Sequence, residues 1–254
     1  MKRPRWQTIR KIWVRTGALA GGIFITWSLV AYRAQSSAGA ALDSDARVTV
    51  TRGDGYWMLR PASPAPAGLV FFPGALVDPV AYAPLVRAVA EGGHIVVLIE
   101  VPRRGALGGA DGPEVFARAR AATAASAPIA RWVLAGHSRG GVIASIAARD
   151  GFPGIAGLVL IGTSHPRDFS LAHLRLPVTQ IFGSRDTVAD EDKVEAARAR
   201  LPAATRLVRI DGGNHAQFGY YGFQPGDWPA TISREAQQAI TRAAILDALA
   251  QAAR

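Results

Sequence analysis

A glycine-flanked serine, Gly136-His137-Ser138-Arg139-Gly140, lies between an apolar run at residues 132–135 and a stretch at 141–149 that has the pattern of a helix. Gly-x-Ser-x-Gly between a strand and a helix is the nucleophile-elbow pattern: a tight turn holds the serine in a strained conformation at the strand tip. The pentapeptide alone arises readily by chance, so its surroundings carry the inference. We therefore take Ser138 as a candidate nucleophile.

The rest of the chain beyond residue 46 alternates short apolar runs with amphipathic segments. A β-hairpin is expected at 47–51 and 56–59, around the turn Gly53-Asp54-Gly55. Buried strands are expected at 69–72, 94–100, 132–135, 157–161, 178–182 and 206–210, and helices at 79–91, 113–127, 141–149, 191–201 and 232–252. This alternation predicts one α/β domain over residues 47–254, with a doubly wound, mostly parallel sheet and helices on both faces.

A serine nucleophile needs a base to take its proton and a third group to orient that base. In this architecture the site forms at the carboxyl ends of the strands, with an acid and then a histidine following the serine along the chain. Asp186 and His215 each come just after a predicted strand, in that order. Asp190 and Asp192 are better placed to cap the next helix. The order and the placement of Asp186 and His215 therefore fit an orienting acid and a base.

Several segments together resemble the α/β-hydrolase superfamily, and closely its dienelactone-hydrolase-like branch, the alpha/beta hydrolase fold-5 group. They are Phe72-Pro73-Gly74-Ala75 with Asp78-Pro79 and Ala81-Tyr82, then 136–141, 183–186, 212–219 and 224–227. The resemblance covers about residues 45–250 and implies a triad of Ser138, Asp186 and His215. Arg139 and the Arg103-Arg104-Gly105 loop depart from what is expected of this group, so the substrate stays open.

An oxyanion hole should be formed by two backbone N–H groups. One comes from the residue after the nucleophile, Arg139. The other comes from the loop at residues 73–76, where we expect Ala75 and keep Leu76 as the alternative. Of the other histidines, His165 stands at the edge of the site, whereas His94 and His137 are interpreted as structural. No His, Asp or Glu spacing suggests a metal, and the chain has no cysteine, so no metal or cofactor is expected.

The N-terminus is basic and then apolar. Seven of the 29 basic residues lie within residues 1–33, which contain no acidic residue. The rest of the chain contains 22 basic and 19 acidic residues. This distribution argues against nucleic-acid binding. Residues 16–32 are uncharged, with six basic residues before them and Arg33 after them. We expect residues 1–33 to be a signal anchor that places the enzyme domain outside the cytoplasm, followed by a linker at 34–46. A signal peptide cleaved after Ala38-Gly39-Ala40 is the alternative.

Together these features predict a serine hydrolase that acts on carboxylic esters or related small acyl substrates through an acyl-enzyme. An acyltransferase using the same triad, and a non-catalytic binding protein that keeps the fold, are the alternatives. The substrate-binding residues and the oligomeric state are left open.

Overall fold

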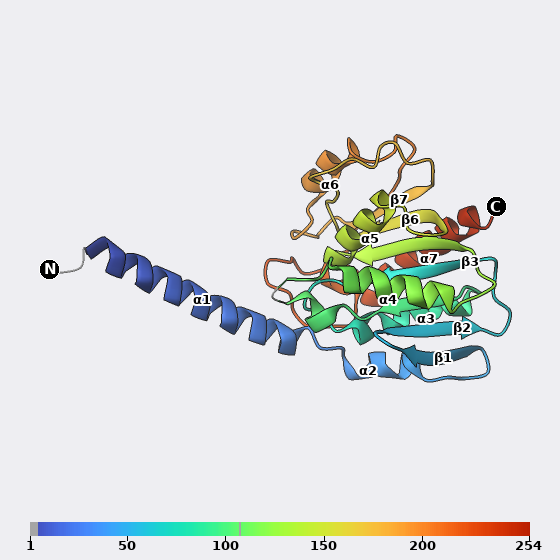
Figure 1. Ribbon diagram of the computed structural model, residues 1–254, viewed down its shortest axis with the longest axis horizontal. Coiled ribbons are helices and arrows are strands. Elements are labelled where there is room, and N and C mark those ends of the chain that lie inside the picture. Colours follow the sequence, from blue (N-terminus) through green and yellow to red (C-terminus); the bar gives the residue numbers. More distant parts are fainter. Residues whose placement is uncertain (1–4, 107) are drawn as a thin grey trace.

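The computed structural model describes residues 5–106 and 108–254, and its centre is one eight-stranded sheet (Figure 1). The strands lie in the order β1-β2-β4-β3-β5-β6-β7-β8. All pairs from β4 to β8 are parallel, and only β1–β2 and β2–β4 are antiparallel within the described chain. The bounds are β1 (Val48–Gly53), β2 (Tyr56–Pro61), β3 (Ala67–Phe72), β4 (Val96–Ile99), β5 (Arg131–His137), β6 (Ile155–Ile161), β7 (Val178–Gly183) and β8 (Arg206–Ile210). The predicted mostly parallel sheet is confirmed.

Successive side chains of a strand point to opposite faces of the sheet, and in the central strands both sets are apolar. Helices therefore cover both faces. In β3, Leu69 and Phe71 join a core with α3 (Ala83–Glu91) and α7 (Arg234–Ala252). Their neighbours Val70 and Phe72 join a second core with α4 (Pro113–Ala124) and α5 (Arg139–Arg149). The remaining helix of the domain, α6 (Glu191–Arg198), follows β7.

The crossover connections place the sheet's switch point at its centre. The chain passes from β3 to β4 on one side and then returns to β5 on the other side of β3. Loops diverge at such a point, so a crevice forms at the carboxyl ends of the strands. The carboxyl edge of the sheet, meaning the loops that follow β3 to β8, is therefore where a site is expected.

The sequence-based bounds differ from the observed ones by a few residues at several helix and strand ends. The helix expected at 79–91 begins as a 3-10 turn, η2 (Pro79–Tyr82), and becomes α3 at Ala83. Asp78 caps this turn by accepting the N–H of Val80 at 3.1 Å. A side-chain cap of this kind satisfies one of the free N–H groups at a helix start.

Before the sheet, α1 (Arg5–Ala31) is one continuous helix that projects from the domain (Figure 1). Its stretch Trp6–Ala31 is long and apolar enough to cross a membrane. The segment expected to be a linker is instead partly helical, with α2 (Ser36–Gly39) and a 3-10 turn at Ala40–Leu42. Ala38 in this segment is fully buried. The signal anchor predicted at residues 1–33 lies partly outside the described residues, at residues 1–4.

Candidate active site

Ser138 stands between β5 and α5 in a strained backbone conformation, with φ 54° and ψ −119°. Positive φ is costly for a residue with a side chain and persists only where the surroundings enforce it. The flanking glycines make the turn possible. A Cβ on Gly136 would lie 2.1 Å from the backbone of Gly140, and one on Gly140 would lie 1.9 Å from the oxygen of Phe72. The strand–turn–helix context of the elbow is therefore present at Ser138.

Asp186 lies in the loop after β7 and is buried. One carboxylate oxygen, Oδ1, accepts the N–H groups of Val188 and Ala189 at 2.9 and 2.7 Å. The other, Oδ2, is 2.8 Å from Nδ1 of His215. Its own loop thus aims this carboxylate at the histidine. Asp190 is instead the cap of α6, where its side chain accepts the N–H of Lys193.

His215 follows β8 and is also buried, with only 1 % of its surface exposed. Because Nδ1 is engaged with Asp186, Nε2 is the ring nitrogen that remains for a proton from a nucleophile. His215 and Ser138 line the same open cavity of about 200 Å³. We call this the catalytic cavity. Ser138, Asp186 and His215 therefore converge at the carboxyl edge of the sheet.

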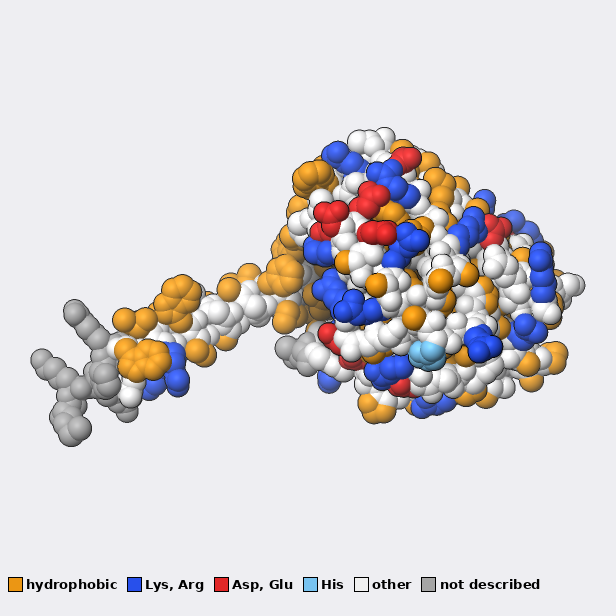
Figure 2. All heavy atoms as spheres, turned by 90° about the horizontal axis from the view of Figure 1, so that it is seen from above, with side chains coloured by type: hydrophobic (Ala, Val, Ile, Leu, Met, Phe, Trp, Pro, Cys, Tyr) orange, Lys and Arg blue, Asp and Glu red, His pale blue; other side chains and the backbone are white. Residues whose placement is uncertain are grey.

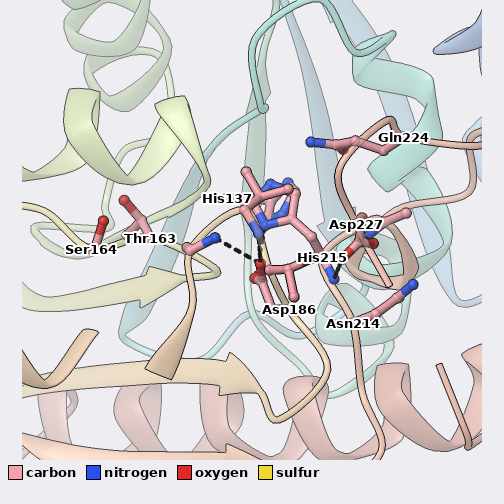
Figure 3. A network of polar contacts seen from close by, with 12 residues as sticks. His137, Thr163, Ser164, Asp186, Asn214, His215, Gln224 and Asp227 are labelled. Atoms are coloured by element: carbon pink, nitrogen blue, oxygen red, sulfur yellow. Dashed lines mark hydrogen bonds and ion pairs between the residues drawn. The ribbon is translucent and has the colours of Figure 1, made fainter. Parts of the chain in front are cut away.

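Asp227 holds the backbone of the histidine loop from the side opposite Asp186 (Figure 3). Its carboxylate oxygens accept the N–H of His215 at 3.1 Å and the N–H of Ala216 at 2.9 Å. Burial raises the pKa of Asp227 above its ordinary value of 3.8, while these two hydrogen bonds lower it. The sequence drew attention to residues 224–227 through family resemblance, but no local pattern revealed this contact.

His137 lies against His215, with ring centroids 4.4 Å apart (Figure 3). Tyr82 Oη lies 2.7 Å from His137 Nδ1 and accepts the N–H of Gly74 at 3.1 Å. Which of the two atoms donates in the Tyr82–His137 contact depends on the tautomer of His137, and His137 Nε2 is buried without a hydrogen-bond partner among the described residues. Burial, and then the charge of His215, hold the pKa of His137 well below 6.5. His137 is a neutral packing partner of His215, in agreement with its interpretation as structural.

The predicted oxyanion donors lie at the same edge of the sheet, one in the loop after β3 and the other at the start of α5. Leu76 has a positive φ of 64°, and its N–H donates to the oxygen of Arg104 at 2.6 Å. The N–H of Ala75 has no acceptor within residues 5–106 and 108–254. The N–H of Arg139 belongs to the first residue of α5, where no acceptor exists inside the helix. Ala75 and Arg139 are thus the free donors, and the alternative Leu76 is engaged elsewhere.

Part of the lining of the catalytic cavity is basic. Arg139, His165 and Arg167 line it. Arg139 forms an ion pair with Asp111 at 2.9 Å, and Arg167 donates to the hydroxyl of Ser164. Burial lowers the pKa of His165, and the charges of Arg167 and Arg139 lower it further. His165 therefore lies where the sequence suggested. Within the described residues no group of three or more His, Asp or Glu could hold a metal ion.

Fold and site define a class of protein. The alpha/beta hydrolase family matches residues 68–239, which is more than half of the chain. The chain therefore belongs to the alpha/beta hydrolase family.

Solved structures of this kind resemble the whole domain. An α/β serine hydrolase without a lid from Xanthomonas campestris is 18% identical, with a TM-score of 0.56 over 82% of this chain and 95% of that one. Dienelactone hydrolase from Anabaena variabilis is also 18% identical, with a TM-score of 0.59 over 80% of this chain and 99% of that one. A search of curated protein sequences gave no significant match. Likeness at this level of sequence identity shows the fold alone.

Proposed function

We propose that this protein is a serine hydrolase of carboxylic esters or related acyl compounds, with Ser138, Asp186 and His215 as its catalytic triad. One observation carries the proposal: the strained Ser138 faces the same cavity as a buried histidine whose Nδ1 is bound to a buried carboxylate. A buried Asp–His pair next to a nucleophile elbow is the arrangement that activates a serine hydroxyl.

In the first half of the reaction, Ser138 Oγ attacks the ester carbonyl carbon while its proton passes to Nε2 of His215. Asp186 holds the imidazole in the tautomer that can accept this proton and stabilises the imidazolium that results. The carbonyl oxygen becomes an oxyanion and accepts the N–H groups of Ala75 and Arg139. The bond to the leaving alkoxide then breaks, His215 returns the proton to it, and an acyl-Ser138 remains.

In the second half, a water molecule attacks the acyl carbonyl carbon and gives its proton to His215. Collapse of this second oxyanion releases the carboxylic acid and returns the proton to Ser138. The substrate is expected to be small, because the catalytic cavity holds about 200 Å³. The connection from β6 to β7, residues 162–177, contains no helix or strand, which leaves the cavity without a large cover. The relative from Xanthomonas campestris is likewise described as lacking a lid.

We also propose that α1 is retained as a membrane anchor with the hydrolase domain on the extracytoplasmic side. The stretch Trp6–Ala31 includes Arg10, Lys11 and Arg15, and its uncharged part together with Tyr32, residues 16–32, reaches about 25 Å at 1.5 Å per residue, close to the ~30 Å of a bilayer core. Basic residues lie mainly before its apolar part, which favours a cytoplasmic N-terminus.

A fluorophosphonate probe tests the nucleophile directly, since it reacts only with an activated serine. The wild-type chain should be labelled, and Ser138→Ala should lose both labelling and turnover of a p-nitrophenyl ester panel of rising acyl length. Ser145→Ala is the matched control, because Ser145 is a buried helix serine that donates to the oxygen of Gly141. Labelling that survives Ser138→Ala would refute the assignment.

The same experiment separates the alternatives. A wild-type chain that is never labelled would indicate a binding protein that keeps the fold. Labelling followed by transfer of the acyl group to an added alcohol, with little free acid, would indicate an acyltransferase.

A further inference from the structure

We propose that the carboxyl edge of the sheet lies against the bilayer that holds α1, with Phe223 and Trp228 in the membrane interface. The inference rests on the anchor of the proposed function and goes beyond it: α1 alone would tether the domain in any orientation, whereas docking of this edge presents the catalytic cavity to the membrane surface.

The first observation is that α1 ends directly on the carboxyl edge. The apolar run ends at Tyr32, whose oxygen accepts the N–H of Asp78 at 2.9 Å in the loop after β3. The oxygen of Ala31 accepts the N–H of Gly222 at 3.1 Å, in the segment that follows His215. No spacer therefore separates the end of the apolar helix from the loops of the site, and Figure 1 shows α1 leaving the domain from this edge.

The second observation is that the orientation of α1 is constrained. The last carbonyl groups of a helix have no N–H donor inside the helix, so they accept hydrogen bonds from donors elsewhere. Two of the last carbonyl groups of α1 accept hydrogen bonds from the domain. The oxygen of Ala31 accepts the N–H of Gly222, and the oxygen of Leu29 accepts from the Arg104 guanidinium at 3.0 Å. The Tyr32 ring also packs edge-on against Tyr221, with centroids 5.5 Å apart. The helix is thus held by backbone, charged and aromatic contacts together.

The third observation concerns exposed apolar surface. In the described part of the domain beyond α1, the large hydrophobic side chains that are exposed are Phe223 at 68 %, Trp228 at 58 % and Ile240 at 41 %. The two most exposed are aromatic and line one hollow of about 360 Å³ together with Gln35, close to the end of α1. Isolated exposed apolar residues are ordinary, but two aromatic rings beside a membrane helix form the pattern of an interfacial belt.

The arginine side chains on this edge are also suited to contact with a bilayer surface. The Arg185 guanidinium lies 5.3 Å from the ring of Trp228, and Arg234 lines the hollow. Arginine side chains can extend from apolar surroundings toward lipid headgroups. Figure 2 shows hydrophobic side chains along α1 as far as its junction with the domain, and Arg and Lys side chains on the surface beside that junction. A bilayer is favoured over a soluble partner because a membrane that contains α1 lies next to this edge.

The chain contains no cysteine, so single cysteines can be placed for spin labelling in the full-length protein. Three variants in lipid nanodiscs suffice. Phe223→Cys reports on the proposed docking edge, and Leu19→Cys lies in the exposed apolar part of α1. Ala204→Cys is exposed just before β8, at the opposite edge of the sheet. Each nitroxide is measured for collision with oxygen, which concentrates in lipid, and with a water-soluble nickel chelate.

We expect the labels at positions 19 and 223 to favour oxygen and the label at 204 to favour the nickel chelate. A label at 223 that behaves like the one at 204, while position 19 favours oxygen, overturns the docking and leaves the anchor and the triad intact. A label at 223 shielded from both reagents with spin–spin broadening indicates contact between two copies and also overturns it. A water-exposed label at 19 overturns the anchor and the docking together. Fluorophosphonate labelling of the same samples reports on the triad separately.

Discussion

The backbone oxygen of Arg104 accepts the N–H of Leu76 at 2.6 Å, and both residues have positive φ, 54° and 64°. This contact joins the Arg103-Arg104 loop to the loop that should supply an oxyanion donor. The Arg104 side chain in turn binds Asp78 at 2.7 Å and the oxygen of Leu29 in α1 at 3.0 Å. The arginine that looked out of place in the sequence thus connects the N-terminal helix to the oxyanion loop.

Arg104→Ala should lower kcat while changing KM little, because the strained loop loses the contacts that hold it and Ala75 moves relative to the substrate. We expect a fall of about tenfold, less than the ~10²–10³-fold lost when an oxyanion donor is removed outright. Arg103→Ala is the matched control, since it has a similar φ of 49°. Steady-state kinetics with a p-nitrophenyl ester make the comparison. Equal effects of the two substitutions would disprove the special role of Arg104.

Asp186→Asn should leave the protein folded and lower kcat by up to roughly 10⁴-fold, because the amide favours the wrong tautomer of His215. Asp190→Asn is the control: its side chain caps α6 and does not contact the histidine. Circular dichroism checks the fold and ester hydrolysis gives kcat. Near-normal kcat in Asp186→Asn, with a large loss in Asp190→Asn, would move the acid to Asp190.

Asp227→Asn tests whether the carboxylate positions the histidine loop. An amide presents only one acceptor oxygen, so the N–H of His215 or of Ala216 loses its partner. We expect kcat to fall with KM nearly unchanged. Asp192→Asn, on the exposed surface of α6, is the control for loss of a surface charge. The same loss of kcat in both variants would show that Asp227 has no specific role.

The raised pKa of Asp227 also determines the direction in which its contribution to stability changes with pH. Between its ordinary value of 3.8 and the raised value, the folded protein keeps a proton that the unfolded chain has released. The contribution of Asp227 to stability is therefore greatest at low pH and falls as pH rises through this window. The free energy of unfolding of wild type minus that of Asp227→Asn should therefore decrease as the pH rises above the ordinary value of 3.8. Urea unfolding in detergent measures it, and an increase would contradict the burial effect.

Gly140→Ala should destabilise the protein by about 3 kcal/mol or more, because the new Cβ would overlap the oxygen of Phe72 in β3. Ser138 would also be displaced, so activity should be lost with stability. Gly39→Ala in α2 is the control, since its Cβ would meet nothing within 4 Å. Thermal unfolding compares the two variants. A Gly140→Ala protein as stable as Gly39→Ala would mean that the elbow is less tightly packed than described.

Retention of α1 should appear in the mass of the mature protein. Intact-mass analysis of membrane-extracted chain should show a species that still contains residues 13–32. A soluble species beginning near Ala41 would instead favour a cleaved signal peptide. A reporter fused after Arg254 and active only in the cytoplasm would refute export.

The local sequence determined the elements and the order of the site residues. The alternating apolar runs predicted the buried strands, and Gly136 and Gly140 marked the turn at Ser138, because each such feature depends on neighbours a few residues apart. Asp186 and His215 could be placed after their strands for the same reason. These are properties that backbone geometry and hydrophobic periodicity dictate within a short segment.

Only the tertiary structure decided which of these groups touch. Asp227 lies 12 residues from His215, and Tyr82 lies 55 residues from His137, so no periodic pattern links them. The same holds for Arg104 and Leu29, which are 75 residues apart. Such contacts arise when the fold brings segments from different parts of the chain to the carboxyl edge of the sheet, and the packing of side chains there then selects partners. Spacing along the chain does not encode that selection, because it depends on the three-dimensional path of every connection between the strands.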